Sequence, residues 1–221
     1  MDQNTKKQRV AEAVLDYIDN GESLGIGSGS TVNILIENLS KVKNKIRNVV
    51  SSSVKSTELL EANGFEVSEL RDVGRLTKYI DGADEVNKDL QMIKGGGGAL
   101  TREKILAHNS NQFICIVDDS KKVDTLGKFP LPIEVIPLSR SSVSLELIKH
   151  GGRPVLRENF VSDNGNLILD IHNLQIMEPI KLEQTINNIP GVVTNGIFAL
   201  DHANLLLCAS DSGIDKTDLN A

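Results

Sequence analysis

The 221-residue sequence contains no tryptophan, and aromatic residues make up only 3% of it. Its two cysteines, Cys115 and Cys208, each sit in an apolar run, so we expect buried reduced thiols rather than a disulfide. No apolar run is long enough to cross a membrane, and the polar start MDQNTKKQRV lacks the apolar core of a signal peptide. These absences predict a cytoplasmic protein without a membrane partner.

Positive charge is also scarce, because 24 lysines and arginines face 30 acidic residues and the formal net charge is -6. A general affinity for nucleic acid is therefore not expected, although lysines and amide groups can still hold a small phosphate locally. The four histidines are scattered and show no zinc-ligand spacing with the cysteines. We expect no metal.

Apolar periodicity predicts an amphipathic helix over 5–19. Strands are expected at SLGIG, VVSSS, FEVSEL, TKYID and FICIVD, and helices at TVNILIENLS, KSTELLEANG and TREKILAHNS. This alternation, from about Leu24 to Asp118, predicts a doubly wound α/β domain with a parallel sheet. Ligands of such sheets bind beyond the carboxyl ends of the strands.

The pattern changes after Asp124. Strands at IEVIP, RPVLREN, NLILDIH and VVTNGIFA, with helices over 139–150 and at KLEQTINNI, give the order β-α-β-β-α-β of a ferredoxin-like α+β unit. The Asp163–Gly165 tripeptide DNG predicts a hairpin turn, and NLLLCAS is expected to return to the first sheet. The predicted domains are therefore 1–125 with 203–221, and 126–202.

The segment GIGSGST follows the first predicted strand and opens a helix. Its free amides and the hydroxyls of Ser28, Ser30 and Thr31 suit one phosphate. The dinucleotide pattern G-x-G-x-x-G fails in both registers, and no Gly-Lys-Ser/Thr follows as in nucleotide hydrolases. A phosphate loop and a tight turn with a serine cap both remain open.

Two carboxylates, Asp81 and Asp84, flank Gly82 and Ala83 where the strand TKYI should stop. At a strand end both could face a crevice, one exchanging protons with a sugar oxygen and the other holding a neighbouring hydroxyl. A solvated Asx turn is the structural alternative.

Four consecutive glycines follow Lys94, and the helix that begins after them carries Glu103 in its first turn. Such a run is costly to order and has apolar flanks, so we interpret it as backbone that approaches a ligand closely rather than as a linker. A carboxylate base beside a lysine and amide donors suits enolisation of a sugar carbonyl. Glu103 as an ordinary first-turn acid and Lys94 as a surface charge are the alternatives.

Taken in order, the segments GIGSGST, SSSVKST, DGADE, MIKGGGGALTREKI, GKFPLPIEV and DNGNLILD resemble the ribose-5-phosphate isomerase A family over essentially the whole chain. The resemblance implies a Rossmann-like doubly wound sheet with a smaller ferredoxin-like domain. It also implies interconversion of ribose 5-phosphate and ribulose 5-phosphate in the non-oxidative pentose phosphate pathway. No metal or organic cofactor is expected, and the expected assembly is a homodimer or homotetramer.

Matched motif by motif, the resemblance makes Glu103 the base that moves a proton between C1 and C2. Asp81, Asp84 and Lys94 are expected to assist catalysis. The expected substrate-binding residues are Ser28, Gly29, Ser30, Thr31, Asp81, Gly82, Ala83, Asp84, Lys94, Gly95, Gly96, Gly97, Lys121 and Lys7. The family often has threonine where Ser28 stands, which keeps the hydroxyl. Lys7 is the least defined match, since Lys6 is adjacent.

Three other functions fit parts of the pattern. A sugar-phosphate-sensing regulator would need a DNA-binding unit, for which the chain has neither room nor charge. The sequence lacks the dinucleotide fingerprint of an NAD-dependent dehydrogenase. An acyl- or CoA-transferase could share the architecture and use a glutamate nucleophile. A coupled assay with ribose 5-phosphate against acetyl-CoA separates the two kinds of enzyme.

Overall fold

The structure, a computed structural model, describes residues 1–219. It divides into two compact units. The first unit comprises Met1–Ala83, Arg102–Lys121 and residues 203–219, and the second comprises Asp84–Thr101 and Lys122–His202. None of the described helices is long and apolar enough to span a membrane.

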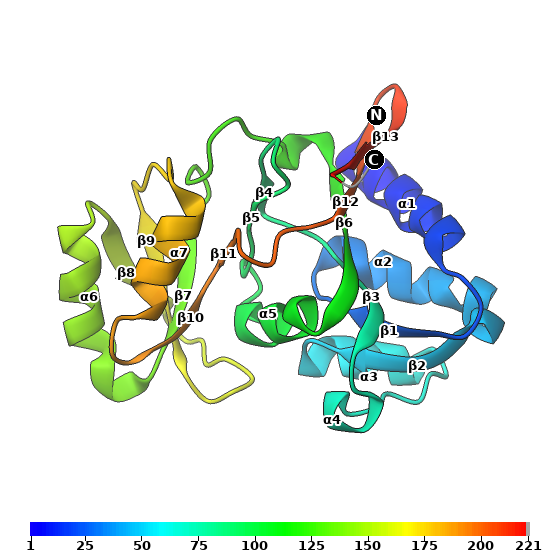
Figure 1. The fold of residues 1–221 in the computed structure, drawn as a ribbon, viewed down its shortest axis with the longest axis horizontal. Helices are drawn as coiled ribbons and strands as arrows, with labels where there is room; N and C mark the ends of the chain where they lie inside the picture. Colours follow the sequence, from blue (N-terminus) through cyan, green and yellow to red (C-terminus); the bar gives the residue numbers. More distant parts are fainter. Residues whose placement is uncertain (220–221) are drawn as a thin grey trace. The chain divides into compact units, whose positions relative to one another are not determined.

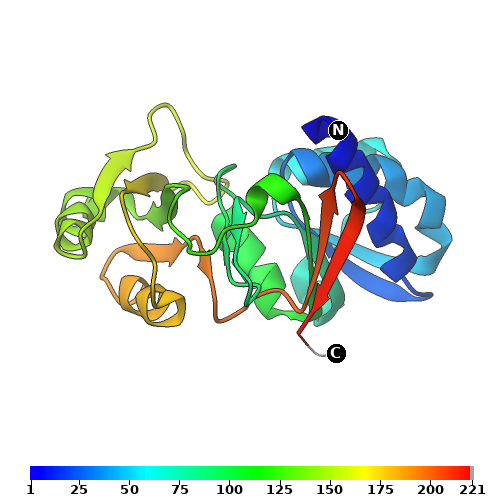
Figure 2. The ribbon, with the colours of Figure 1, turned by 90° about the horizontal axis from the view of Figure 1, so that it is seen from above.

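A six-stranded sheet forms the centre of the first unit (Figure 1). In spatial order its strands are β13 (Gly213–Asp218), β12 (Leu205–Ser210), β6 (Ser110–Asp118), β3 (Leu76–Asp81), β1 (Glu22–Ile26) and β2 (Ile46–Ser51). Five strands run parallel, and β13 turns back antiparallel to β12, as the orange-to-red hairpin in Figure 2 shows. The doubly wound prediction is confirmed. The strand order reverses between β1 and β3, where such sheets bind ligands.

Helices cover both faces of this sheet (Figure 1). The helical segments here are α1 (Gln3–Ala13), η1 (Val14–Tyr17), α2 (Ser30–Asn38), η2 (Leu39–Lys45), α3 (Val54–Ala62), α4 (Leu70–Val73), α5 (Leu100–His108) and η3 (Asp119–Lys121). Alternation along the strands decides which face each residue joins. Leu24, Ile26 and Ile80 pack into the core under α1 and α2, whereas Gly25 and Tyr79 lie on the side of Leu106 in α5.

Two expectations for this unit need correction. The helix expected over 5–19 is an α-helix only to Ala13 and continues as the 3₁₀ turn η1. The strand expected at FEVSEL was wrong, because only Val67 forms a bridge, to Val49 at the sheet edge.

The main sheet of the second unit has the spatial order β10 (Val192–Asn195), β7 (Leu131–Val135), β9 (Leu167–His172) and β8 (Arg153–Leu156), all antiparallel. The helices are α6 (Arg140–Lys149) and α7 (Pro179–Asn187), with the short η4 (Pro137–Ser139) before α6. Ile133, Leu169 and Ile171 form one core with Val143 of α6 and Ile186 of α7. This is the predicted β-α-β-β-α-β arrangement, so the ferredoxin-like prediction is confirmed.

A second, smaller sheet joins β11 (Ile197–Phe198), β5 (Met92–Ile93) and β4 (Glu85–Val86). Through these pairs Asp84–Thr101 packs with Lys122–His202, whereas the predicted domain bounds put it in the larger domain. The strand expected over 192–199 is split at Gly196, whose backbone lies so close to Lys94 that a Cβ would stand 2.3 Å from the Lys94 carbonyl oxygen. Strands of two residues carry too little pattern to be predicted.

Candidate active site

The glycine-rich turn begins where β1 ends. The Gly27 amide continues the ladder to the carbonyl of Ile80 in β3 at 3.0 Å. A Cβ on Gly27 would stand 1.9 Å from Cγ of Asp81, so only glycine leaves room for that carboxylate. Gly29 (φ 103°) is the N-cap of α2 and directs the chain into the helix. The turn therefore presses the end of β1 against the end of β3.

Asp81 is the last residue of β3 and is fully buried. Its Oδ1 accepts hydrogen bonds from the amides of Ser28 at 3.1 Å and Gly82 at 2.7 Å. Its Oδ2 accepts a short hydrogen bond from the hydroxyl of Tyr79, two residues earlier on the same face of the strand. These donors fix the carboxylate at the switch point of the sheet.

Tyr79 is a donor throughout the ordinary pH range. Burial raises the pKa of its hydroxyl, and the negative charges of Asp81 and Glu103 raise it further, well above its usual value. The sequence patterns did not single out Tyr79. Tyr79 lies two residues before Asp81 on one strand, which puts both side chains on the same face, and this spacing could have identified it.

Glu103 lies in the first turn of α5 and is only 3% exposed. Its Oε1 accepts a hydrogen bond of 2.6 Å from the hydroxyl of Ser28. Because the Ser28 amide also binds Asp81, one residue of the glycine-rich turn connects both carboxylates. Three segments far apart in the sequence therefore meet at one strand end, as the strand-end rule predicts.

Lys7, on α1, extends to the same turn, where its Nζ lies 3.0 Å from Oγ of Ser30. Its neighbour Lys6 instead forms ion pairs with Asp119 at 2.9 Å and Asp211 at 3.2 Å. Ser30 and Thr31 open α2, so a cation and a helix N-terminus share this position. This geometry favours Lys7 over Lys6 as the anion-binding lysine.

Lys121 closes η3, directly after β6. Near it, burial acts to raise the pKa of Asp118, but hydrogen bonds from Ser120 and Gln3 and the charge of Lys121 outweigh burial and lower that pKa. Lys121 therefore stands at a parallel strand end beside an ionised carboxylate.

Ala83 is the last residue of this segment of the first unit, whereas Asp84, Lys94 and the run Gly95–Gly97 belong to the second unit. The Asp84 carboxylate accepts a hydrogen bond of 2.8 Å from the Gly96 amide. Lys94 is 3% exposed, and its Nζ lies 5.4 Å from the centre of the Phe198 ring. The alternative that Lys94 is an exposed charge on the surface is therefore wrong. Gly95 and Gly98 have φ of 103° and 84°, which explains why this run needs glycine.

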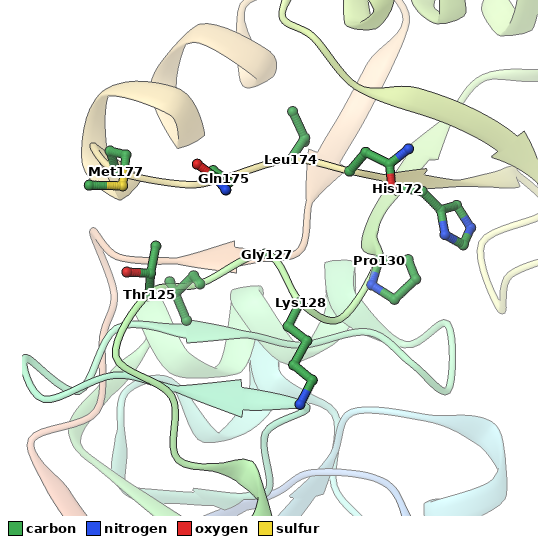
Figure 3. A pocket seen from close by; sticks show the side chains of 10 residues that line it. Thr125, Gly127, Lys128, Pro130, His172, Leu174, Gln175 and Met177 are labelled. Carbon is green, nitrogen blue, oxygen red and sulfur yellow. The ribbon is translucent and has the colours of Figure 1, made fainter.

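A pocket of about 650 Å³ in the second unit contains none of these residues (Figure 3). It is lined by Thr125, Leu126, Gly127, Lys128 and Pro130 on one segment and His172, Asn173, Leu174, Gln175 and Met177 on the other. A hydrogen bond from the Ile176 amide to the Leu126 carbonyl joins the segments. The pocket has no carboxylate in its lining and gathers no acid–base pair. Within residues 1–219 no three His, Cys, Asp or Glu side chains cluster as metal ligands.

The matching family model and the similar known proteins all point to the same family. The family model described as ribose 5-phosphate isomerase A (phosphoriboisomerase A) matches residues 48–213. A ribose-5-phosphate isomerase A from Buchnera aphidicola subsp. Acyrthosiphon pisum is 52% identical over 97% of this chain and 96% of its own length.

Two solved structures match nearly the whole chain. The ribose 5-phosphate isomerase A of Neisseria gonorrhoeae has a TM-score of 0.96 at 47% identity, covering 98% of this chain and 97% of that one. A D-ribose-5-phosphate isomerase in complex with phospho-erythronic acid has a TM-score of 0.95 at 35% identity, covering 99% of this chain and 100% of that one. The chain belongs to the ribose 5-phosphate isomerase A family.

Proposed function

We propose that this chain interconverts D-ribose 5-phosphate and D-ribulose 5-phosphate by proton transfer through an enediolate. The observation that carries the proposal is the contact of Ser28 with both Glu103 and Asp81 at the switch point of the sheet. It places a buried carboxylate next to a turn suited to a phosphorylated ligand. The complex of a related isomerase with phospho-erythronic acid, a phosphorylated sugar acid, supports a substrate of this class.

The phosphate is held at the start of α2. Ser30 and Thr31 supply hydroxyls and helix amides there, and Lys7 supplies a positive charge. Lys121 is proposed to contribute a second charge. Binding energy from the phosphate, which does not react, holds the sugar carbons in a reactive pose.

Asp81 assists opening of the furanose ring by exchanging a proton with a ring or hydroxyl oxygen. Glu103 then removes the proton from C2, and the electron pair moves to form the enediolate. Glu103 next delivers a proton to C1, and the hydroxyl proton of O2 passes to O1, so the product is an isomer and no atom or electron is gained or lost. Ser28 holds the Glu103 carboxylate through its 2.6 Å hydrogen bond.

Asp84, Lys94 and the run Gly95–Gly97 lie in the second unit, and their roles in catalysis and sugar binding stay predictions of the family resemblance. A place in the non-oxidative pentose phosphate pathway, a cytoplasmic location and a homodimeric or homotetrameric assembly belong to the same proposal. Light scattering during size-exclusion chromatography measures the assembly.

The decisive variant is Glu103→Gln, which keeps the shape of the side chain and removes its basicity. We expect kcat to fall by at least about 10²-fold, while KM stays within about tenfold, as for loss of a general base. Glu22→Gln is the matched control, because Glu22 is also buried but begins β1 at the opposite end from Gly27.

Glu22→Gln should keep the wild-type rate. An equally active Glu103→Gln enzyme would remove Glu103 from its role. A wild-type protein that transfers a group from acetyl-CoA and leaves ribose 5-phosphate unchanged would contradict the proposed function itself.

A further inference from the structure

The glycine run has a partner that the sequence patterns did not indicate. Arg157, the residue after β8, directs its guanidinium at the carbonyl side of the run. Its Nη1 donates to the carbonyl oxygens of Gly95 at 3.3 Å and Gly96 at 3.2 Å, and Nη2 donates to Gly95 at 3.4 Å. One planar group thus holds two successive peptide carbonyls.

Arg157 is itself held in place. Its Nε and Nη2 bind Oδ2 and Oδ1 of Asp170, on β9, at 2.9 and 2.5 Å, in the two-pronged geometry that fixes a guanidinium plane. The guanidinium carbon also lies 5.2 Å from the centre of the Phe160 ring. That ring fills the space beside Gly98, where a Cβ would stand 2.1 Å from Cζ of Phe160.

Because each peptide group is planar, fixing the direction of its carbonyl also fixes the direction of its N–H. In a trans peptide the C=O and N–H point to opposite sides, and the described chain has no cis peptide. With its carbonyl toward Arg157, the Gly95–Gly96 peptide turns its N–H away, where Asp84 accepts it at 2.8 Å. The Gly96–Gly97 peptide likewise turns the Gly97 N–H away from Arg157.

The charge of Arg157 adds to this effect. A cation at a peptide carbonyl polarises that peptide and makes its N–H a stronger donor. Without such a contact, consecutive glycines would populate many orientations of the same peptides. Arg157 therefore acts on the direction and the donor strength of the Gly96 and Gly97 amides, together with Asp84, which accepts from the Gly96 amide, and the Gly98 amide, which donates to the Gly95 carbonyl.

We infer that Arg157, fixed by Asp170, is a positioning residue for isomerisation. It orients the Gly95–Gly96 and Gly96–Gly97 peptides, so that the Gly96 amide holds Asp84 and the Gly97 amide binds the developing oxyanion. The inference rests on the proposed function and on the predicted role of this loop. The alternative is a structural role alone, in which the Arg157–Asp170 pair only joins β8 to β9. A merely structural role would change stability and leave turnover unchanged.

The test compares Arg157→Met and Asp170→Asn with the control Arg153→Met, which changes an exposed arginine at the start of the same strand. We expect Arg157→Met to lower kcat about 10²-fold, the scale of a lost oxyanion donor, with a smaller change in KM. Asp170→Asn should have a smaller effect in the same direction, and Arg153→Met should match the wild type.

Two binding probes make the test specific. Inhibition by phospho-erythronic acid, which carries an anionic carboxylate next to its hydroxyls, should weaken in Arg157→Met. Inhibition by inorganic phosphate should stay as in the wild type. Methylguanidinium added to Arg157→Ala should restore part of kcat, since it supplies the missing group.

Wild-type kcat in Arg157→Met or Asp170→Asn, with only a lower melting temperature, would overturn the inference. An equal loss of affinity for both probes would also overturn it, because it would indicate general disruption. If Arg157→Met fails to fold, the kcat and probe affinities of Asp170→Asn decide. An inactive wild-type protein would instead show that the proposed function fails.

Discussion

Ser28 is the residue on which the site geometry depends most directly, because its amide and its hydroxyl bind two different carboxylates. Substitution by alanine removes the hydroxyl and keeps the amide. Ser28→Ala should therefore lower kcat/KM by about tenfold, as expected for one lost hydrogen bond to a charged group. Ser28→Thr keeps the hydroxyl and should keep most of the activity.

Steady-state kinetics on both variants, with thermal melting as a control, measures the difference. A Ser28→Ala enzyme as active as the wild type would mean that the contact with Glu103 does not assist the base.

Tyr79 and Asp81 form another hydrogen-bonded pair in the site. Tyr79→Phe removes one hydroxyl and leaves Oδ2 of a fully buried carboxylate without that donor. We expect a loss of about 1–3 kcal/mol in the free energy of unfolding, together with reduced kcat. Urea denaturation and kinetics on the same preparation measure both. Unchanged values of both would show that Asp81 is held by the amides of Ser28 and Gly82 alone.

At the scale of elements, a partly buried ion pair joins β1 to β3 at the end opposite the site. Lys78 lies 2.5 Å from Glu22 and 2.9 Å from Asp19. Burial by itself lowers the pKa of Lys78, but hydrogen bonds and charges of Glu22 and Asp19 outweigh burial and raise that pKa above its ordinary value. Folding therefore favours the protonated lysine.

This raised pKa fixes the sign of a pH effect. The stabilisation by Lys78 is fully present below the lysine's unfolded pKa and is lost as pH rises through the higher folded pKa. Lys78→Met should lower the free energy of unfolding at neutral pH by about 1–3 kcal/mol, because buried Glu22 loses its cation. The variant's deficit should shrink at alkaline pH, as urea titrations at several pH values can measure. A deficit that grows with pH would contradict the assignment.

Most long elements could be predicted from their periodicity. The parallel strands of the first unit and the β-α-β-β-α-β order of the second follow from apolar runs and turn residues such as Gly165 (φ 79°). The small sheet of β4, β5 and β11 could not be predicted, because strands of two residues have no period and pair only through tertiary contacts. For the same reason the placement of Asp84–Thr101 differs from the expected domain bounds.

In the site, too, some features follow from the sequence and others depend on tertiary contacts. That Gly27–Thr31, Asp81 and Glu103 would gather follows from the rule that parallel strands end at one edge. That Ser28 connects both carboxylates depends on side-chain directions, which sequence spacing does not give. Arg157 lies 60 residues or more from the glycines it binds, and no local pattern marks it.

For the whole molecule, the proposed chemistry uses only side chains and backbone of this chain. Dialysis against a chelator should therefore leave the isomerisation rate unchanged. The rate before and after dialysis, and after adding back Mg²⁺, Mn²⁺ or Zn²⁺, measures this directly. A loss of activity that a divalent cation restores would require a different mechanism.

The claim that Glu103 is the base is tested most directly by following the hydrogen on C2 of the substrate. Ribose 5-phosphate deuterated at C2 is given to the wild-type protein and to Glu103→Gln, and NMR records where the deuterium goes. We predict that the wild type turns over the deuterated sugar more slowly than the ordinary one and moves the deuterium to C1 or to solvent, while Glu103→Gln leaves it at C2. A Glu103→Gln protein that removes the deuterium at the wild-type rate would contradict the account.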